Sequence, residues 1–248
     1  MQVIVPRTTA RKRVSASRSS VRGRRGRPSA TEKNALPETL TEQAYSKLEE
    51  MIVTLELAPG STVSEQGLSQ LSGFGRTPIR EAIQRLAREH LVVVLPQRGL
   101  LISGIDVAKQ LRLLRMRREV ERLVCRSAAK NASAAERAAF AELAAEFTET
   151  AHTNDDIGFI RRDHEFNELC LTAARNEFAE GAMRLMIGLS RRFWYFHYKQ
   201  TADLPETARL HSAVAKAIAE GDVDGAGRAL DQLLDNIESF TRSMVLEI

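Results

Sequence analysis

The sequence predicts a mainly helical protein: an N-terminal winged helix-turn-helix of three helices and a β-hairpin, then an all-α bundle of six helices. Two observations support this fold class. Apolar residues recur at spacings of three and four over most of residues 40–88 and 105–248, as in amphipathic helices. Between these regions, residues 92–102 form two short β-branched and aliphatic runs around a Pro- and Gly-containing turn, which is typical of a hairpin.

Residues 1–37 form a basic tail that we expect to be disordered. They carry ten Lys and Arg and a single acid, so their charge is +9, and the other 211 residues of this +4 chain carry −5. The apolar residues of the tail are isolated, so burial cannot offset the entropy of ordering. An Arg- and Ser-rich start is also found in organelle transit peptides, and that alternative remains open.

Within the tail, Arg25-Gly26-Arg27-Pro28 resembles the core of an AT-hook. An extended Arg-Gly-Arg segment places guanidinium groups in the narrow minor groove of A·T-rich DNA. The alternative is a polybasic arm that contacts phosphates through Arg25 and Arg27 without reading bases. Both interpretations predict that the tail adds to DNA binding.

The composition excludes a membrane-spanning protein. The longest stretch without a charged side chain, Gln66–Gly75, has about half of the ~20 residues that a spanning helix needs. Cys125 and Cys170 show neither CxxC spacing nor a disulfide framework. We therefore expect a cytoplasmic protein with no membrane partner.

Residues 38–104 are the predicted winged helix-turn-helix. Its first helix has an apolar face from Leu40 to Leu55, with Thr41 as the expected N-cap. Its second helix follows the N-cap Ser64, buries Leu68 and Leu71, and ends at Gly73. In its third helix, Thr77 is the expected N-cap and Pro78 the first helical residue.

The third helix carries the candidate DNA-reading residues. Its inward face is apolar, so the polar residues near its start lie on the opposite face: Arg76, Thr77, Arg80 and Gln84. The N-terminal residues of such a helix reach base edges in a major groove, where Arg can pair with guanine. For Arg85 and Arg88, we favour surface ion pairs with Glu81 or Glu89.

This region resembles the signature of GntR-family transcription regulators. The resemblance rests on these segments: Leu57–Gly60, Ser64-Glu65, Leu68–Gly73, Arg76–Ala82, Leu86 and Arg98-Gly99. It implies that Arg76, Thr77 and Arg80 contact phosphates and bases. It also implies that Arg98 and Gly99 form a wing tip at the minor groove. Gln66 stands where the family usually has a DNA-contacting Arg, and Gly75 where it has Ser or Thr, so we expect the basic tail to compensate.

Residues 105–248 are predicted to form an all-α bundle. Its six expected helices lie near 107–131, 134–152, 155–174, 176–199, 204–220 and 222–245. Asp163 and Asn167 share a helix face at i and i+4, and His211 lies near the start of the fifth of these helices.

The segments around Asp163–Asn167 and Leu210–Ala226 resemble the FCD effector domain of FadR-like GntR regulators. Many members bind a divalent metal through an Asp and three His. Here Asn167 and Leu233 replace two of the His, which argues against tight Zn²⁺ or Ni²⁺ binding. Three interpretations remain: a hard divalent ion on Asp163, Asn167 and His211; a metal-free pocket that hydrogen-bonds an organic effector; or polar residues satisfied within the bundle.

The resemblance further implies that Arg117 points into the cavity and clamps a small carboxylate through its guanidinium. Arg192 and Tyr195 are the other candidate effector residues, in an Arg-Arg-Phe-Trp-Tyr-Phe-His-Tyr run. The alternative is that this run packs at a dimer seam, and for Trp194 and Phe196 we favour core packing.

Taken together, these features predict a homodimeric repressor that binds a palindromic operator in double-stranded DNA and responds to a small organic acid. The sequence has no Gly-rich phosphate loop, GxSxG or HExxH motif, so we do not expect an enzyme. Two alternatives are weighed against this prediction: an architectural, sequence-tolerant DNA protein, and a metal-dependent hydrolase that uses Asp163 and His211.

Overall fold

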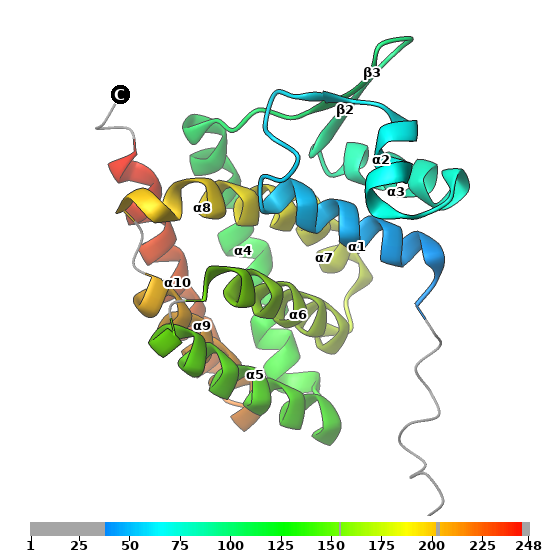
Figure 1. Cartoon of the computed structure of the whole chain (residues 1–248). Helices are drawn as coiled ribbons and strands as arrows, with labels where there is room; N and C mark the ends of the chain where they lie inside the picture. Colours follow the sequence, from blue (N-terminus) through cyan, green and yellow to red (C-terminus); the bar gives the residue numbers. More distant parts are fainter. Residues whose placement is uncertain (1–37, 154, 202–203, 245–248) are drawn as a thin grey trace, which may run out of the picture. The chain divides into compact units, whose positions relative to one another are not determined.

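The computed structural model describes residues 38–153, 155–201 and 204–244, so the AT-hook-like segment with Arg25 and Arg27 lies outside the described residues. The predicted fold class is confirmed (Figure 1). The first elements are α1 (Leu40–Val53), β1 (Thr62–Val63), α2 (Glu65–Ser72), α3 (Arg76–Arg88), β2 (Val92–Leu95) and β3 (Gly99–Ile102). The later helices are α4 (Val107–Asn131), α5 (Ala134–Thr153), α6 (Asp156–Ala174), α7 (Glu177–Arg184), α8 (Ile187–Thr201), α9 (Leu204–Glu220) and α10 (Val223–Ser243).

The three N-terminal helices and the sheet enclose their own hydrophobic core. Leu48 and Ile52 of α1 pack with Ile79 and Ile83 of α3 and with Leu100 of β3, and all five are almost completely buried. Leu40 and Leu71, which the sequence predicted to be inward-facing, are 65% and 62% exposed. They stand near the ends of α1 and α2, where no other described element covers the apolar face.

The helix starts differ from the prediction in two places. Thr39, not Thr41, caps α1, because Thr39 and Glu42 form a reciprocal capping box. Gly75 precedes α3 without a side-chain cap, so Thr77 is not the N-cap and Pro78 is the third helical residue. Proline is tolerated there because the first-turn amides have no intrahelical acceptor. Ser64 and Gly73 flank α2 as predicted.

The sheet contains a strand that the sequence did not predict. Its order is β1-β3-β2, and both pairs are antiparallel, with Thr62 opposite Leu101 and Val94 opposite Leu100. At the start of β3, Gly99 has a φ of +93°, and a Cβ there would lie 2.8 Å from the carbonyl oxygen of Val63. Gly99 is therefore required by the close approach of β1, independently of any role in DNA binding.

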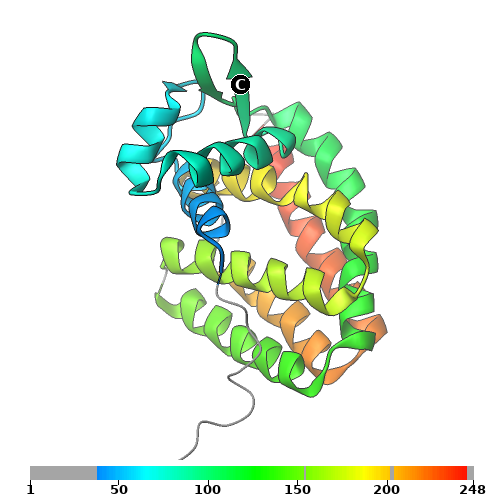
Figure 2. The ribbon, with the colours of Figure 1, turned by 90° about the vertical axis from the view of Figure 1, so that its right-hand side faces the viewer.

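The C-terminal helices form a second core. In it, α5 packs along α9, and α10 packs along α4 and α9 (Figure 2). The single helix predicted at 176–199 is two helices, α7 and α8, separated at Leu185-Met186, so this part of the described chain has seven helices rather than six. Among the described residues, no helix is long and apolar enough to cross a membrane.

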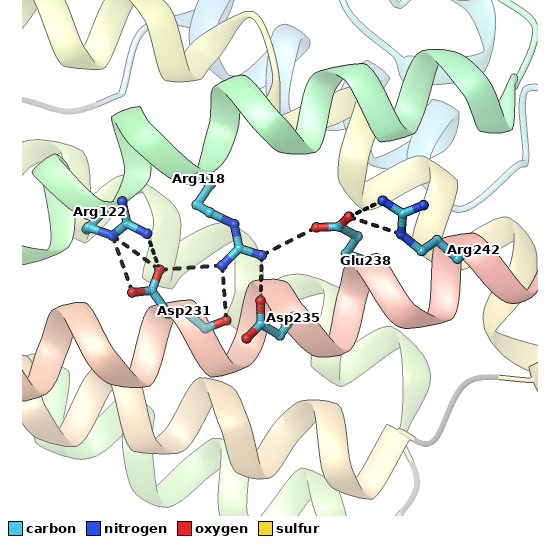
Figure 3. Close-up of polar contacts among 6 residues, drawn as sticks. All are labelled: Arg118, Arg122, Asp231, Asp235, Glu238 and Arg242. Carbon is cyan, nitrogen blue, oxygen red and sulfur yellow. Dashed lines mark hydrogen bonds and ion pairs between the residues drawn. The ribbon is translucent and has the colours of Figure 1, made fainter.

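A row of ion pairs joins α4 to α10 on the surface. Arg122 contacts Asp231 at 2.6 Å, and Arg118 contacts Asp235 at 2.7 Å and Glu238 at 3.5 Å (Figure 3). Exposed pairs of this kind contribute little free energy individually. These ion pairs instead help to orient α4. Arg118 faces α10, and the adjacent Arg117 points into the bundle.

We predict that Gly99→Ala destabilises the winged domain. The alanine Cβ would meet the Val63 carbonyl at a backbone angle that L-residues rarely adopt, so the free energy of unfolding should fall by about 1–3 kcal/mol. Denaturant unfolding measures this change. Gly104→Ala is the matched control, because nothing lies within 4 Å of a Cβ at that position. Equal stability of the two variants would contradict the packing argument.

Candidate DNA interface and effector pocket

The start of α3 presents polar side chains to solvent. Its apolar face is buried against α1 and α2, which leaves Arg76, Thr77, Arg80 and Gln84 exposed. These four side chains, together with Glu81, line one shallow surface hollow. The predicted DNA-reading residues are therefore brought together on one face.

Two further predicted contacts flank this helix. Gln66 is exposed in the first turn of α2, and Arg98 is exposed in the turn between β2 and β3. Arg80 is held by an ion pair with Glu65 at 3.1 Å, in which both side chains are about half exposed. Because an exposed pair is weak, the Arg80 guanidinium can exchange Glu65 for a base or a phosphate.

Arg85, on the same helix, is part of the domain's packing instead. Its Nε lies 3.1 Å from Glu89, and its guanidinium stacks over the Tyr45 ring of α1 at 3.4 Å from the ring centre. The Tyr45 hydroxyl donates to the other oxygen of Glu89 at 2.7 Å. Arg85 thus pairs with Glu89 as expected, but the pair is largely buried rather than on the surface, and its contacts with Tyr45 tie α3 to α1.

A small cavity lies inside the helical domain. Among the described residues, it is lined by Arg117 of α4, Asp163 of α6, Ser190 and Arg191 of α8, and His211 of α9, with an apolar remainder from Phe159, Ile160, Trp194 and Ile237 and a contribution from Thr207. Its free volume is about 30 Å³, the size of one or two water molecules. The cavity is nearly filled by its own side chains.

Asp163 is the central acid of this cavity. Asn167 Nδ2 donates to Asp163 Oδ1 at 3.0 Å, and His211 Nε2 lies 3.3 Å from the same oxygen. Arg191 Nε donates to Asp163 Oδ2 at 2.8 Å. The structure therefore brings Asp163, Asn167 and His211 together as predicted. Asn167 donates a hydrogen bond to the Asp163 carboxylate but does not itself line the cavity.

Arg117 points into the cavity, as the family resemblance implied. It is 4% exposed, and its Nε and Nη2 donate to Glu121 at 2.6 and 3.0 Å. Its remaining terminal nitrogen donates to Ser190 Oγ at 2.7 Å. A guanidinium and a hydroxyl thus meet at the cavity wall, and both can bond to a carboxylate.

The second cavity arginine is Arg191, whereas the sequence prediction named its neighbour Arg192. Arg192 turns the other way and donates to the Ser103 and Gly104 carbonyls at 2.9 and 3.1 Å, where β3 leads into α4. Tyr195 also does not line the cavity. Trp194 is buried as expected, whereas Phe196 is 43% exposed, so the core placement of Phe196 was wrong.

The residues of this cavity do not fit a divalent metal ion. Both oxygens of Asp163 already face hydrogen-bond donors, and two guanidinium groups flank the place where a cation would bind. At the fourth position of the family pattern, Leu233 is fully buried and offers no ligand atom. Within the described chain, no cluster of three or more His, Cys, Asp or Glu side chains is suitable for a metal.

Helix phase could have distinguished Arg191 from Arg192, because Arg191 lies three residues before the buried Trp194. The sequence prediction assumed one continuous helix over 176–199, whereas the structure has a break at Leu185-Met186. The sequence analysis missed Glu49 of α1, which contacts Arg191. In the sequence, an acid next to the apolar face of a helix looks like a solvent-exposed residue, and nothing local shows that it is buried.

Comparison with known proteins assigns both halves of the described chain. Residues 40–102 match the family described as bacterial regulatory proteins, gntR family, and residues 112–236 match the FCD domain. A curated regulator from an unstable DNA locus of Streptomyces ambofaciens is 48% identical over 65 residues, which are 26% of this chain and 28% of that protein.

Longer matches cover both domains. The uncharacterized HTH-type transcriptional regulator YdfH of Escherichia coli O6:H1 is 25% identical over 214 residues, 86% of this chain and 93% of that protein. The HTH-type transcriptional repressor RspR of Escherichia coli K12 is 24% identical over 205 residues, 83% and 90% of the two chains. The solved structure of E. coli McbR/YncC has the same fold, with a TM-score of 0.69 at 19% identity over 84% of this chain and 99% of that chain.

We predict that Asp163 makes stability depend on pH in the acid range. Burial opposes its ionisation, but the hydrogen bond from His211 and the charges of Arg191 and Arg117 outweigh burial and lower its pKa from 3.8 to about 2. A carboxyl with a lowered pKa stabilises the fold above its unfolded pKa, and the contribution, here about 2 kcal/mol, is lost as pH falls from about 4 to 2. In Asp163→Asn, the free energy of unfolding should not show this loss when it is measured as a function of pH. Identical slopes for the two proteins in that window would contradict it.

Proposed function

The chain belongs to the GntR family of transcriptional regulators with a C-terminal FCD domain, and from this membership we propose that it is a homodimeric repressor whose operator affinity is set by a small organic acid. The observation that carries the acid assignment is the pair of buried arginines, Arg117 and Arg191, at one cavity. The DNA assignment rests on the exposed face of α3.

On DNA, α3 would enter the major groove with Arg76, Thr77, Arg80 and Gln84 at its leading end. Arg98, in the exposed turn of the wing, would reach the neighbouring backbone or minor groove. Gln66 at the start of α2 offers an uncharged donor at a position where a cation would contribute more to phosphate binding.

A palindromic operator follows from two copies of this domain. Two recognition helices read half-sites about one turn of DNA apart, so the symmetry of the operator mirrors the two-fold symmetry of the protein. We propose the repressor direction because RspR, which matches over most of both chains, is named a repressor. We further propose that binding of the acid lowers the affinity of this repressor for its operator.

Small organic acids are the ligand class that the cavity chemistry favours. A guanidinium binds a carboxylate through two parallel hydrogen bonds, and the apolar side chains of Phe159, Ile160 and Trp194 complete a wall for a short carbon chain. The relatives are transcriptional regulators, and none of the cavity geometry favours the hydrolase or the architectural alternative over this function.

We predict that Arg80→Ala weakens binding to a duplex selected from random sequence by about 1–3 kcal/mol and relaxes base preference at one position of each half-site. Competition binding against scrambled duplexes measures both effects. Arg88→Ala is the matched control, because Arg88 is exposed at the opposite end of the same helix. Unaltered discrimination by the Arg80 variant would remove this residue from the base contacts.

We predict that acetate, lactate, succinate or citrate raises the melting temperature, because a ligand that binds only the folded state stabilises it. Arg117→Lys keeps the positive charge but loses the paired donors of the planar guanidinium. The affinity for the best of these acids should therefore fall about tenfold or more. Arg118→Lys, on the same helix but facing α10, should leave that affinity unchanged. A cavity role for Arg117 is rejected if the two variants bind the acid equally well.

A further inference from the structure

Arg191 has a second acidic partner outside the effector domain. While its Nε donates to Asp163 at 2.8 Å and its Nη2 donates to the Ile160 carbonyl at 2.7 Å, its Nη1 donates to Glu49 of α1. Helices α1 and α8 lie side by side in both views (Figures 1 and 2). One guanidinium thus belongs both to the wall of the cavity and to the contact with the DNA-binding domain.

The contact is buried and closely packed. Glu49 is 3% exposed and Arg191 5% exposed. Gly188, one helical turn before Arg191, lets α8 approach, because a Cβ there would lie 2.8 Å from Leu91 Cδ1 and 3.5 Å from Glu49 Oε1. A buried carboxylate that loses its cation is strongly destabilised, so Glu49 and Arg191 either remain together or separate with a movement that exposes Glu49 to water.

An organic acid that binds Arg191 would have to replace one of its present partners. The free volume of the cavity is about 30 Å³, and the Arg191 guanidinium already donates to Asp163, Glu49 and the Ile160 carbonyl. Asp163 is also bonded to Asn167 and His211 within the bundle. Glu49, by contrast, lies on α1, whose apolar face packs mainly in the core of the N-terminal domain, so it is the one acid partner of Arg191 that is not held within the bundle.

We propose that Glu49 is an internal competitor that occupies Arg191 until an effector carboxylate replaces it, so that effector binding releases α1 from α8. This inference rests on the proposed acid-sensing function and names how the same cavity is coupled to DNA binding. The competition requires no contact between effector and DNA. It requires only that the effector carboxylate and Glu49 compete for the same Nη1 of Arg191, because its Nε and Nη2 are held by Asp163 and the Ile160 carbonyl.

The release would reach the recognition helix through a short chain of contacts. Glu49 lies one turn from Tyr45 on α1, and Tyr45 donates to Glu89 directly after α3, where Arg85 pairs with the same carboxylate. Burial raises the pKa values of Tyr45 and Glu89, and the negative charge of Glu49 adds to both shifts. A displacement of α1 therefore moves the packing support of α3.

A neighbouring ion pair provides a matched control. Glu50 contacts Arg161 of α6 at 2.8 Å across the same boundary, but Arg161 does not line the cavity, and its side chain is 58% exposed. Neutralising Glu50 weakens the domain boundary without freeing a cavity arginine. Glu49→Gln and Glu50→Gln therefore separate competition for Arg191 from general loosening of the boundary.

The experiment measures the dissociation constants of acetate, lactate, succinate and citrate for wild type, Glu49→Gln and Glu50→Gln by calorimetry. Glu49→Gln should bind the best of these acids at least about fivefold more tightly than wild type, as expected for loss of a coupled competitor. Glu50→Gln should match wild type. The acid should also change the affinity for a selected duplex less in Glu49→Gln than in the other two proteins.

Hydrogen exchange on the wild-type protein gives a readout that does not depend on any variant. Saturation with the best acid should speed amide exchange in residues 40–53. Unchanged exchange there, or equal acid affinity of Glu49→Gln and wild type, overturns the competition while leaving acid sensing intact. If none of the four acids binds wild type or Glu49→Gln, the acid-sensing function itself is rejected, and the competition with it.

Discussion

The buried guanidinium of Arg191 is the interaction on which the arrangement of this regulator depends. It donates to Asp163 of α6 and to Glu49 of α1, so it links the helical bundle to the domain that carries α3. Buried charges are costly unless they are paired, and pairs of this kind act more as constraints on geometry than as sources of stability. Here the constraint fixes α1 against α8 when the cavity is closed.

The cavity and the exposed start of α3 differ in how their side chains are held. The residues at the start of α3 are exposed and only weakly held, as the Arg80–Glu65 pair shows. The cavity residues are almost completely buried and strongly paired. In the proposed mechanism, an effector would change few contacts in the bundle, and one of them involves α1. Two guanidinium groups, those of Arg117 and Arg191, line the cavity where many members of the family hold a cation.

Much of the fold was predictable because its signals are local. The cap Ser64, the left-handed Gly73 and the apolar spacing of α3 place the helix-turn-helix, and the i, i+4 spacing of Asp163 and Asn167 places two residues of the cavity cluster on one face. What could not be predicted depends on distant partners. Strand β1 has two residues and exists because β3 pairs with it. The burial of Glu49 depends on Arg191, a residue 142 positions away.

The proposed coupling between acid binding and DNA binding is tested most directly by a reciprocal titration. The acid that binds most tightly is titrated into the protein with and without a saturating selected duplex, and the duplex is titrated with and without saturating acid. Linkage requires the two affinities to change by the same factor, and we expect that factor to be about fivefold or more. An acid affinity that is identical in the presence and absence of DNA would contradict the account.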